Sequence, residues 1–482
     1  MKQGRYIQFS YIVIGILAFC YVLIRAIKVG VTYDEAWTIS QFVPQSVLHI
    51  LNYSPCDANN HLTNTLLIKL FFSFGNESLL IARLPNVLAF LLYLYYGYKL
   101  TSKHLSPFVG LSCFLLLLLN PFLLDFFSLA RGYGLSLGFI LASIYFACNY
   151  VRDGTISSVV KSVGLGAIAV LCNFSVLNYW MALVVVVNGI ALLPATRSNF
   201  KKTFLYSLGI ALLLTAISYE PIRKLKLNGN FSYGGTISFY SDTLTSLTKY
   251  TLYNSEYTSV VNYSLIGFLV VLGLFVVISF FFDRTIYSLK NVILGITTLS
   301  ILSVILQYYL LGTLYVTDRT ALFFYPLLIF CLCFSANTFS NKHFAKSIVV
   351  VVLLMGINLG KKANLYKTAT WYFDAHSEEI LGMINEKGKA QNKKMKIDFS
   401  WPFESSFYYH LQHTNYPFVE VVKIKEDREA LNTEADVYIY LDQSLDKVGY
   451  DASGQKIRSV DKDTIKQYTS EHIFVFGNLK EQ

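Results

Sequence analysis

The sequence predicts an all-α polytopic membrane protein with about eleven transmembrane helices, followed by a small water-soluble α/β domain. Of the 482 residues, 54% are hydrophobic and only 15% are charged, and the mean hydropathy is +0.46. Soluble domains carry about 25% charged residues. The charge is also uneven, because residues 361–482 hold 36 charged residues while the 360 residues before them hold only 34. We therefore expect a membrane domain over residues 1–360 and a soluble domain over residues 361–482.

The spans are placed by the apolar segments. A membrane span needs about 20 mainly apolar residues. Segments of this kind occupy residues 7–27, 79–98, 106–124, 132–150, 159–175, 177–194, 203–221, 260–282, 289–311, 319–336 and 345–360. A further apolar stretch, residues 62–74, is too short to span, and we expect it to form an interfacial helix or a helix within a loop.

Basic residues orient these spans, because they collect in short cytoplasmic loops. With the N-terminus in the cytoplasm, the inner segments hold 13 Lys or Arg against two Asp, whereas the outer segments hold 10 basic and nine acidic residues. The odd number of spans then puts residues 361–482 outside the cytoplasm. The long loops 28–78 and 222–259 lie on the same side, so we expect the outer face to carry the function. The formal net charge of +10 arises in the membrane part and does not indicate nucleic-acid binding.

The tail has the mixed pattern of a small α/β domain. Residues 374–386 have helical spacing. Four segments alternate or are rich in β-branched residues, as strands are: residues 396–399, 418–424, 436–441 and 472–476. The tail contains no catalytic motif, so we expect it to be a structural cap or a cap that contacts the acceptor.

Two carboxylates, Asp34 and Glu35, open the first outer loop directly after the first span. Acidic residues near membrane depth mark functional sites by default. The alternative is structural, because Asp and Glu also favour the first turn of a helix, and the spacing of the following apolar residues predicts an amphipathic helix that begins near Glu35. The residues alone leave both interpretations open.

Further motifs follow in order at the outer ends of the spans. They are Asn60-His61, Gly75-Asn76-Glu77-Ser78, Ala82-Arg83-Leu84-Pro85, Ala130-Arg131-Gly132-Tyr133, and Asp318-Arg319 ahead of Pro326. Together with the early Asp34-Glu35, this order resembles the bacterial membrane glycosyltransferases of the protein O-mannosyltransferase and aminoarabinose transferase type, which form the family 39 group of the GT-C fold. The resemblance covers about residues 1–370 and is strongest over 31–140.

The resemblance implies a transferase of the bacterial plasma membrane that takes a sugar from a polyprenyl-phosphate carrier at the outer face. Asp34 matches the family's general base, which activates the acceptor hydroxyl, and Glu35 would orient or support it. Arg131 and Arg319 would contact the lipid phosphate as it leaves.

The resemblance also assigns weaker roles. Asn60 and His61 are expected to line the same cavity, and Tyr133 joins them as a candidate substrate contact. Arg83 is another such candidate, although it also suits a helix end anchored at the headgroups. Many relatives carry an acidic residue two positions before the arginine that matches Arg131; that position here is Leu129, and Asp125 is the candidate catalytic residue to replace it.

The chemistry of these residue types agrees with this function. A guanidinium group stabilises a leaving phosphate better than an ammonium group does, because of its fork geometry. A carboxylate can act as base for a hydroxyl that attacks an anomeric carbon, and a single displacement would invert the configuration there. The sequence contains no metal-ligand motif; it leaves open a divalent cation, the sugar, and whether the acceptor is a glycan, a lipid or a protein.

Three other functions compete with this one. They are a transporter or flippase for lipid-linked sugars, an O-antigen ligase or polymerase, and a scaffold whose loops bind a partner. Transporters tend to show internal repeats and broken spans near the midplane, and we find no repeat. Ligases and polymerases carry their key loop late in the chain, whereas here the acid-rich loop is the first.

Overall fold

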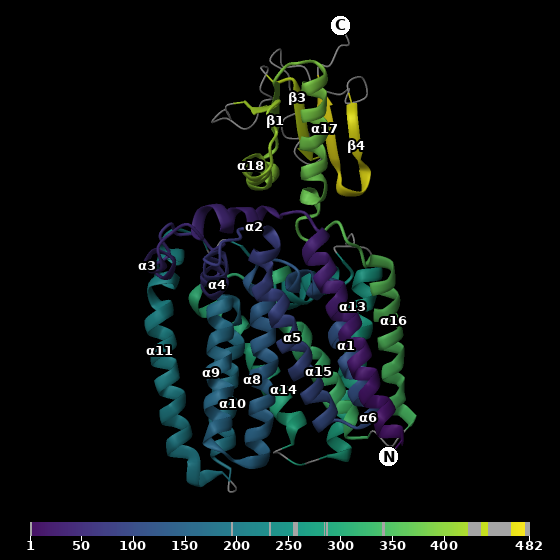
Figure 1. Ribbon diagram of the computed structural model, residues 1–482. Helices are drawn as coiled ribbons and strands as arrows, with labels where there is room; N and C mark the ends of the chain where they lie inside the picture. Colours follow the sequence, from purple (N-terminus) through teal and green to yellow (C-terminus); the bar gives the residue numbers. More distant parts are fainter. Residues whose placement is uncertain are drawn as a thin grey trace. The chain divides into compact units, whose positions relative to one another are not determined.

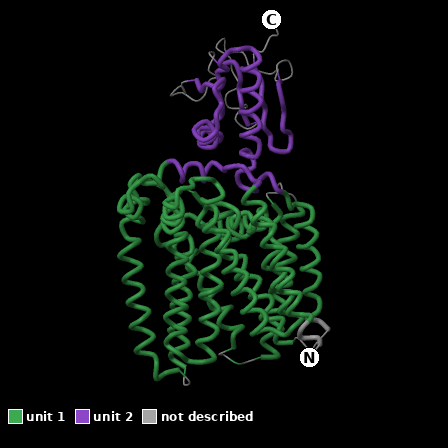
Figure 2. The backbone as a smooth tube through the Cα atoms, in the orientation of Figure 1, with its two compact units in different colours: residues 1–27, 41–364 green, residues 28–40, 365–482 purple. Residues whose placement is uncertain are grey.

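The chain forms two compact units in a computed structural model (Figure 2). The structure describes residues 2–193, 196–230, 233–253, 259–283, 285, 288–339, 343–422, 435–441 and 464–477. Unit 1 comprises residues 1–27 and 41–364, and unit 2 comprises residues 28–40 and 365–482. Unit 2 thus includes a segment of the first loop, residues 28–40, which the sequence division at residue 360 assigned to the membrane domain.

Unit 1 is a bundle of long apolar helices (Figure 1). Its principal helices are α1 (Lys2–Lys28), α5 (Leu79–His104), α6 (Pro107–Leu118), α7 (Pro121–Phe127), α8 (Gly132–Asp153), α9 (Ile156–Cys172), α10 (Leu177–Ala191), α11 (Phe200–Leu227), α13 (Ser259–Phe282), α14 (Leu289–Leu311), α15 (Phe324–Asn337) and α16 (Ile348–Lys362). Among the described residues, eight helices are long and apolar enough to cross a membrane, and α6 with α7 gives a ninth span bent by 67°. The protein is therefore a multi-pass membrane protein.

The expected number of eleven spans is not confirmed. Every predicted segment is helical, but α9 has 17 residues and α16 has 15, both shorter than a full span. The stretch that begins at Leu62 forms α4 (Leu62–Phe72), whose 11 residues cannot cross a bilayer. Two inner basic residues used for orientation, Arg284 and Lys342, lie outside the described residues.

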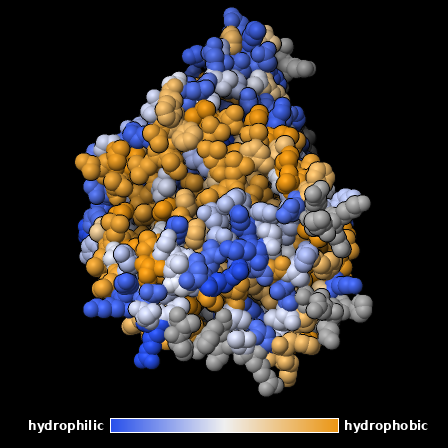
Figure 3. All heavy atoms as spheres, turned by 60° about the horizontal axis from the view of Figure 1, so that its bottom comes forward, coloured by the Kyte–Doolittle hydropathy of each residue, from blue (hydrophilic) through white to orange (hydrophobic). Residues whose placement is uncertain are grey.

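The surface of unit 1 suits a bilayer. Large apolar side chains are exposed along the outer helices, among them Leu17, Leu212, Val277 and Leu354. Figure 3 shows hydrophobic side chains over the flanks of the bundle and hydrophilic ones gathered on the end face near the N-terminus. Exposing such apolar flanks to lipid tails is not unfavourable, whereas exposing them to water is.

The interior of unit 1 is organised around α8. This helix packs against α5 and α9, and most of its residues are buried. Short helices connect the spans: α3 (Val47–Leu51), α4, η2 (Phe174–Val176), η4 (Phe239–Leu244), α12 (Thr245–Thr251) and η5 (Asp318–Ala321). Helices α3 and α4 lie at the end of the bundle opposite the N-terminus (Figure 1), where α8 also begins, since α4 packs against it.

The described part of unit 2 is a mixed sheet with helices. Its strands β1 (Met395–Phe399), β2 (Val419–Val421), β3 (Val437–Leu441), β4 (Thr464–Tyr468) and β5 (Ile473–Gly477) lie in the order β2-β1-β3-β5-β4. β1 is parallel to β2 and β3, and β5 is antiparallel to β3 and β4. The core packs Ile397, Ile439 and Val475 of the sheet with Ile384 of α17 (Ser377–Ala390) and Phe407 of α18 (Glu404–His413).

These elements confirm the expected α/β tail. All four predicted strands and the helix are present, although residues 423 and 424 of the second predicted strand lie outside the described part. Strand β4 and helix α18 were not predicted. Unit 2 also contains α2 (Tyr33–Trp37), from the first loop.

Candidate functional site

The predicted site residues fall into two groups, one in each unit, and each group is described by itself. Asp34 and Glu35 belong to α2 in unit 2. The other candidates, from Asn60 to Arg319, belong to unit 1.

Helix α2 begins at a capping box. Thr32 is the N-cap, and the Oε2 of Glu35 accepts hydrogen bonds from the Thr32 backbone N–H at 3.1 Å and from its hydroxyl at 3.0 Å. Glu35 is fully buried, while Asp34 retains 7% exposure. Glu35 is therefore committed to forming the helix terminus, and Asp34 is the carboxylate of the pair that does not take part in this cap.

A third carboxyl group, which sequence reasoning missed, lies against this helix. The Oδ2 of Asp374, in η7 (Tyr372–His376), accepts the backbone N–H of Tyr33 at 2.6 Å. Asp374 is buried, and burial together with the charges of Asp34 and Glu35 raises its pKa well above the ordinary value, against the opposing hydrogen bonds from Ser406 and Tyr33. The sequence carries no motif at this position that could have identified it.

Arg131 is held rigidly in unit 1. It is the N-cap residue of α8 and is 1% exposed. One terminal nitrogen of its guanidinium donates to the backbone carbonyl of Asn59 at 3.2 Å, and the other donates to the Asn59 side-chain oxygen at 2.5 Å. The loop before α4 thus fixes the direction of this guanidinium group.

Arg319 is the second arginine that the sequence analysis predicted to contact the lipid phosphate. It lies in η5, and its guanidinium carbon is 4.6 Å from the centre of the Tyr233 ring. It donates to the Tyr233 hydroxyl at 3.1 Å and pairs with Asp318 at 3.8 Å. The Tyr233 hydroxyl in turn donates to Asp318. These contacts restrict Arg319 while 19% of its side chain stays accessible.

His61 is the third predicted residue in this part of unit 1. Its Nδ1 lies 3.1 Å from the carbonyl oxygen of Cys172, which can only accept, so Nδ1 carries the proton in the neutral ring. Its Nε2 is buried and has no hydrogen-bond partner among the described residues. Burial, with the charges of Arg131 and then Arg319, lowers the pKa of His61 well below its usual value. Arg131 is held by Asn59, two residues before His61. Helix η5, which carries Arg319, packs against η2, which begins two residues after Cys172. We call His61, Arg131 and Arg319 the His61 cluster.

Close packing around α8 brings this cluster together. A Cβ on Gly132 would lie 1.9 Å from the Cys172 carbonyl oxygen, and one on Gly134 would lie 2.5 Å from the Phe126 carbonyl oxygen. Contacts this short exclude any side chain at either position. The ring of Tyr133, between the two glycines, packs edge-on against His61 at 4.8 Å, so Tyr133 supports the cluster.

Two buried asparagines, which the sequence interpretation did not select, hold the same region. Asn64 of α4 donates to the Ala130 carbonyl at 2.9 Å, and Asn86 of α5 donates to Asn64 at 2.8 Å. The Leu135 backbone N–H donates to the Asn86 side-chain oxygen at 3.0 Å. Asn64 lies three residues after His61, and Asn86 directly follows Pro85. Polar side chains inside apolar helices are the signal that could have identified both.

Three predicted residues have partners elsewhere. Asn60 donates to the Ile50 carbonyl and accepts from Thr65, which folds the loop before α4. Arg83 is fully buried and donates to the Ala26 carbonyl at 3.0 Å. Asp125 lies 2.6 Å from the Arg25 guanidinium in a buried ion pair. The observed contacts of these three residues join neighbouring segments of unit 1 to one another.

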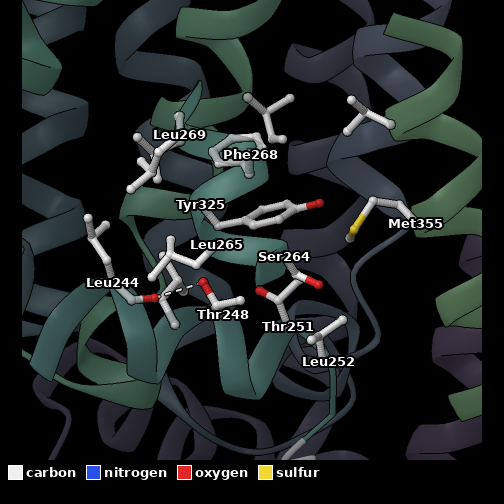
Figure 4. Close-up of a pocket in the computed structure, with 14 residues that line it drawn as sticks. Leu244, Thr248, Thr251, Leu252, Ser264, Leu265, Phe268, Leu269, Tyr325 and Met355 are labelled. Carbon is white, nitrogen blue, oxygen red and sulfur yellow. Dashed lines mark hydrogen bonds between the residues drawn. The ribbon is translucent and has the colours of Figure 1, made fainter. Parts of the chain in front are cut away.

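An apolar pocket of about 120 Å³ lies between α12, α13, α15 and α16 (Figure 4). The ring of Tyr325 lies in it among Leu265, Phe268 and Met355. Helix α12 also packs against η5, which carries Arg319. Of the described residues, no group of three or more His, Cys, Asp or Glu is placed to hold a metal ion.

Comparison with known proteins shows the fold. No family model and no curated protein matches the chain. Among solved structures, ArnT from Cupriavidus metallidurans in the apo state matches with a TM-score of 0.53 and 9% identity, covering 98% of this chain and 100% of that one. The same protein bound to undecaprenyl phosphate matches with a TM-score of 0.55 and 9% identity, covering 98% of each chain. These neighbours confirm the GT-C fold that the sequence resemblance implied.

Proposed function

We propose that the protein is an inverting glycosyltransferase that moves a sugar from a polyprenyl-phosphate donor to an acceptor hydroxyl or phosphate at the outer face of the bacterial plasma membrane. The observation that carries this proposal is the His61 cluster. Two guanidinium groups, of Arg131 (buried) and Arg319 (partly accessible), and the buried neutral imidazole of His61 lie at one end of a membrane bundle, and they suit a lipid-linked phosphate that enters from the bilayer.

The arginines serve the leaving group. As the anomeric C–O bond to the phosphate breaks, its electron pair passes to the phosphate oxygen, and Arg131 and Arg319 stabilise the growing charge. Because their partners already hold them, little reorganisation accompanies the reaction. The first isoprene units of the donor suit the apolar pocket that α12 lines. Helix α12 also packs against η5, which carries Arg319.

Asp34 serves the acceptor. It takes the proton of the acceptor hydroxyl as that oxygen forms the new bond to the anomeric carbon from the face opposite the phosphate, which inverts the configuration. Glu35 maintains the helix that carries Asp34. Arg83, Asn60 and Tyr133 shape the surroundings, and we assign Asp125 to bracing rather than to proton transfer.

The neighbours support the donor class. ArnT, whose fold this chain shares, has been crystallised with undecaprenyl phosphate. A bound carrier lipid in that protein agrees with the phosphate-binding chemistry inferred here. Neither the sugar nor the acceptor follows from this likeness.

The test is Asp34→Asn, which keeps the shape of the side chain and removes its basicity. We expect loss of sugar transfer from a radiolabelled polyprenyl-phosphate sugar by about 10²–10⁴-fold, with undecaprenyl phosphate binding to the purified protein unchanged. Asp153→Asn, an exposed carboxylate at the far end of α8, is the matched control and should keep parent activity. A residual rate within about threefold of the parent contradicts the role of Asp34 as base. Parent-like movement of the labelled lipid across the membrane without any transfer favours a transporter.

A further inference from the structure

Helix α2 cannot be stable on its own. It has five residues and continues into a π-helical turn, η1 (Thr38–Phe42), whereas isolated helices shorter than about 12–15 residues are marginal in water. Its position must therefore come from what it packs against. Within unit 2 that is α18, together with an edge contact of 5.8 Å between the Tyr33 and Trp401 rings. Figure 2 shows residues 28–40 in the colour of the C-terminal unit.

Asp374 adds a polar bond to these apolar contacts. Tyr33 is the first residue of α2, and its backbone N–H is one of the donors that a helix terminus leaves without an intrahelical partner. Thr32 and Glu35 satisfy each other in the capping box, whereas the N–H of Tyr33 is bonded by Asp374 from 341 residues further along the chain. Thus α2 has one cap from its own sequence and one from the C-terminal unit.

A buried carboxyl group carries a free-energy cost at this position when it is ionised. Asp374 is 3% exposed, and the described residues offer no partner to its Oδ1. The nearby charges of Asp34 and Glu35 further oppose its ionisation. An uncharged acceptor such as Asn could accept the same bond, and it would avoid the cost of a buried charge near like charges. What the position requires is an acceptor oxygen in one fixed place.

We propose that Asp374 is a positioning residue that fixes α2 and thereby aims the Asp34 carboxylate, so that the C-terminal unit is part of the reaction apparatus. This inference rests on the proposed function. It assigns the tail a role beyond that of a cap, because the bond from Asp374 holds the first residue of α2 from a distant part of the chain.

The experiment compares Asp374→Ala and Asp374→Asn with the parent. The Ala variant removes the acceptor and should lower kcat at least tenfold, with KM for the donor and binding of undecaprenyl phosphate unchanged. The Asn variant keeps an acceptor oxygen and should restore kcat to within threefold of the parent. Asp436→Ala is the matched control in unit 2, because Asp436 also accepts a backbone N–H, that of Lys396 at 2.9 Å; this variant should keep the parent kcat.

A second pair keeps the inference testable where Asp374→Ala does not fold. Tyr33→Ala and Tyr33→Pro both lose the tyrosine ring, but only the Pro variant also lacks the backbone N–H that Asp374 accepts. Proline is well tolerated at the first helical position. The preceding Thr32 has φ −92° and ψ 157°, which a following proline permits. The Pro variant should therefore have the lower kcat of the two.

Hydrogen exchange supplies a readout that does not depend on activity. The amides of α2 should exchange at least tenfold faster in Asp374→Ala than in the parent or in Asp374→Asn. Unchanged exchange and parent-like kcat in Asp374→Ala overturn the inference, and so does an Asn variant as inactive as the Ala variant. Absence of transfer by the parent itself contradicts the proposed function alone, because the exchange result then still decides the role of Asp374.

Discussion

Arg131 and Arg319 are held by different kinds of contact. Arg131 uses both terminal nitrogens on one asparagine residue, Asn59, so the orientation of its plane is fixed. Arg319 lies over the Tyr233 ring in a cation–π contact and also donates to the hydroxyl of that tyrosine. Both arrangements depend on a planar cation with several donors. The proposed phosphate-binding role of the two arginines therefore depends on guanidinium geometry as well as on charge.

We predict that Arg131→Lys and Arg319→Lys each weaken undecaprenyl phosphate binding and lower transfer at least tenfold. Lysine keeps the charge and loses the fork that grips an oxygen pair. Isothermal titration with the purified variants measures the binding. Arg223→Lys is the control, because Arg223 also makes a two-pronged contact, with Glu220, but on the exposed surface of α11. Lys variants that bind and turn over like the parent would reduce both arginines to helix anchors.

At the scale of elements, the bent pair α6 and α7 places Asp125. Proline occupies the first position of each helix, and Asn120 caps α7 by accepting the Leu123 N–H at 3.2 Å. The break turns Asp125 towards Arg25 of α1. The same guanidinium donates to the backbone carbonyl of Asn364 at 2.5 Å. Through its ion pair with Asp125 and its hydrogen bond to Asn364, Arg25 thus joins α1 to the bent pair α6–α7 and to the last residue of unit 1.

A double-mutant comparison distinguishes bracing from catalysis at Asp125. Asp125→Asn leaves Arg25 as a buried cation without its carboxylate, and removing one partner of a buried pair costs about 3–5 kcal/mol. We predict that its thermal midpoint falls sharply and that Arg25→Gln with Asp125→Asn recovers most of the loss, because no charge is then left unpaired. Transfer activity should recover with stability. A stable double variant without any activity would instead assign Asp125 a direct part in the reaction.

The elements also show what the sequence could predict. Continuous apolar runs such as 260–282 gave helices with ends within a residue or two, because lipid imposes helix on any long apolar segment. Strand β4 was missed because Thr464-Ile465-Lys466-Gln467 is mostly polar and half exposed. The role of Asp125 could not be predicted, since its partner Arg25 is 100 positions away in the sequence and the bend that joins them depends on packing.

At the scale of the whole molecule, a segment from the start of the chain belongs to the same unit as the C-terminal residues. Residues 28–40 leave the first span and fold with the C-terminal unit. The ordered motifs selected Asp34, Arg131 and Arg319 as candidates from local patterns. No local pattern could identify Asp374, because its bond to Tyr33 joins residues that are 341 positions apart in the sequence.

The remaining prediction concerns orientation. Helix α8 has Arg131 at one end and Arg152 at the other, separated by about 30 Å at 1.5 Å per residue. The His61 cluster therefore lies at the opposite end of the bundle from Arg152 and Lys103, which belong to the basic inner loops. Because short basic loops stay in the cytoplasm, we predict that the His61 cluster and the C-terminal tail are extracytoplasmic.

Reporter fusions test this orientation. Alkaline phosphatase, which is active only after export, should be active at the C-terminus of the full chain and inactive when fused after residue 153, at the end of α8. A cytoplasmic fluorescent reporter at the same two points should give the reverse pattern. The full-length fusion leaves the sheet of unit 2 uncut, so an inactive phosphatase there reflects location and not misfolding. An inactive phosphatase with a bright reporter at the C-terminus would place the tail inside, and an outer-face transfer reaction that depends on Asp34 and Asp374 would then be wrong.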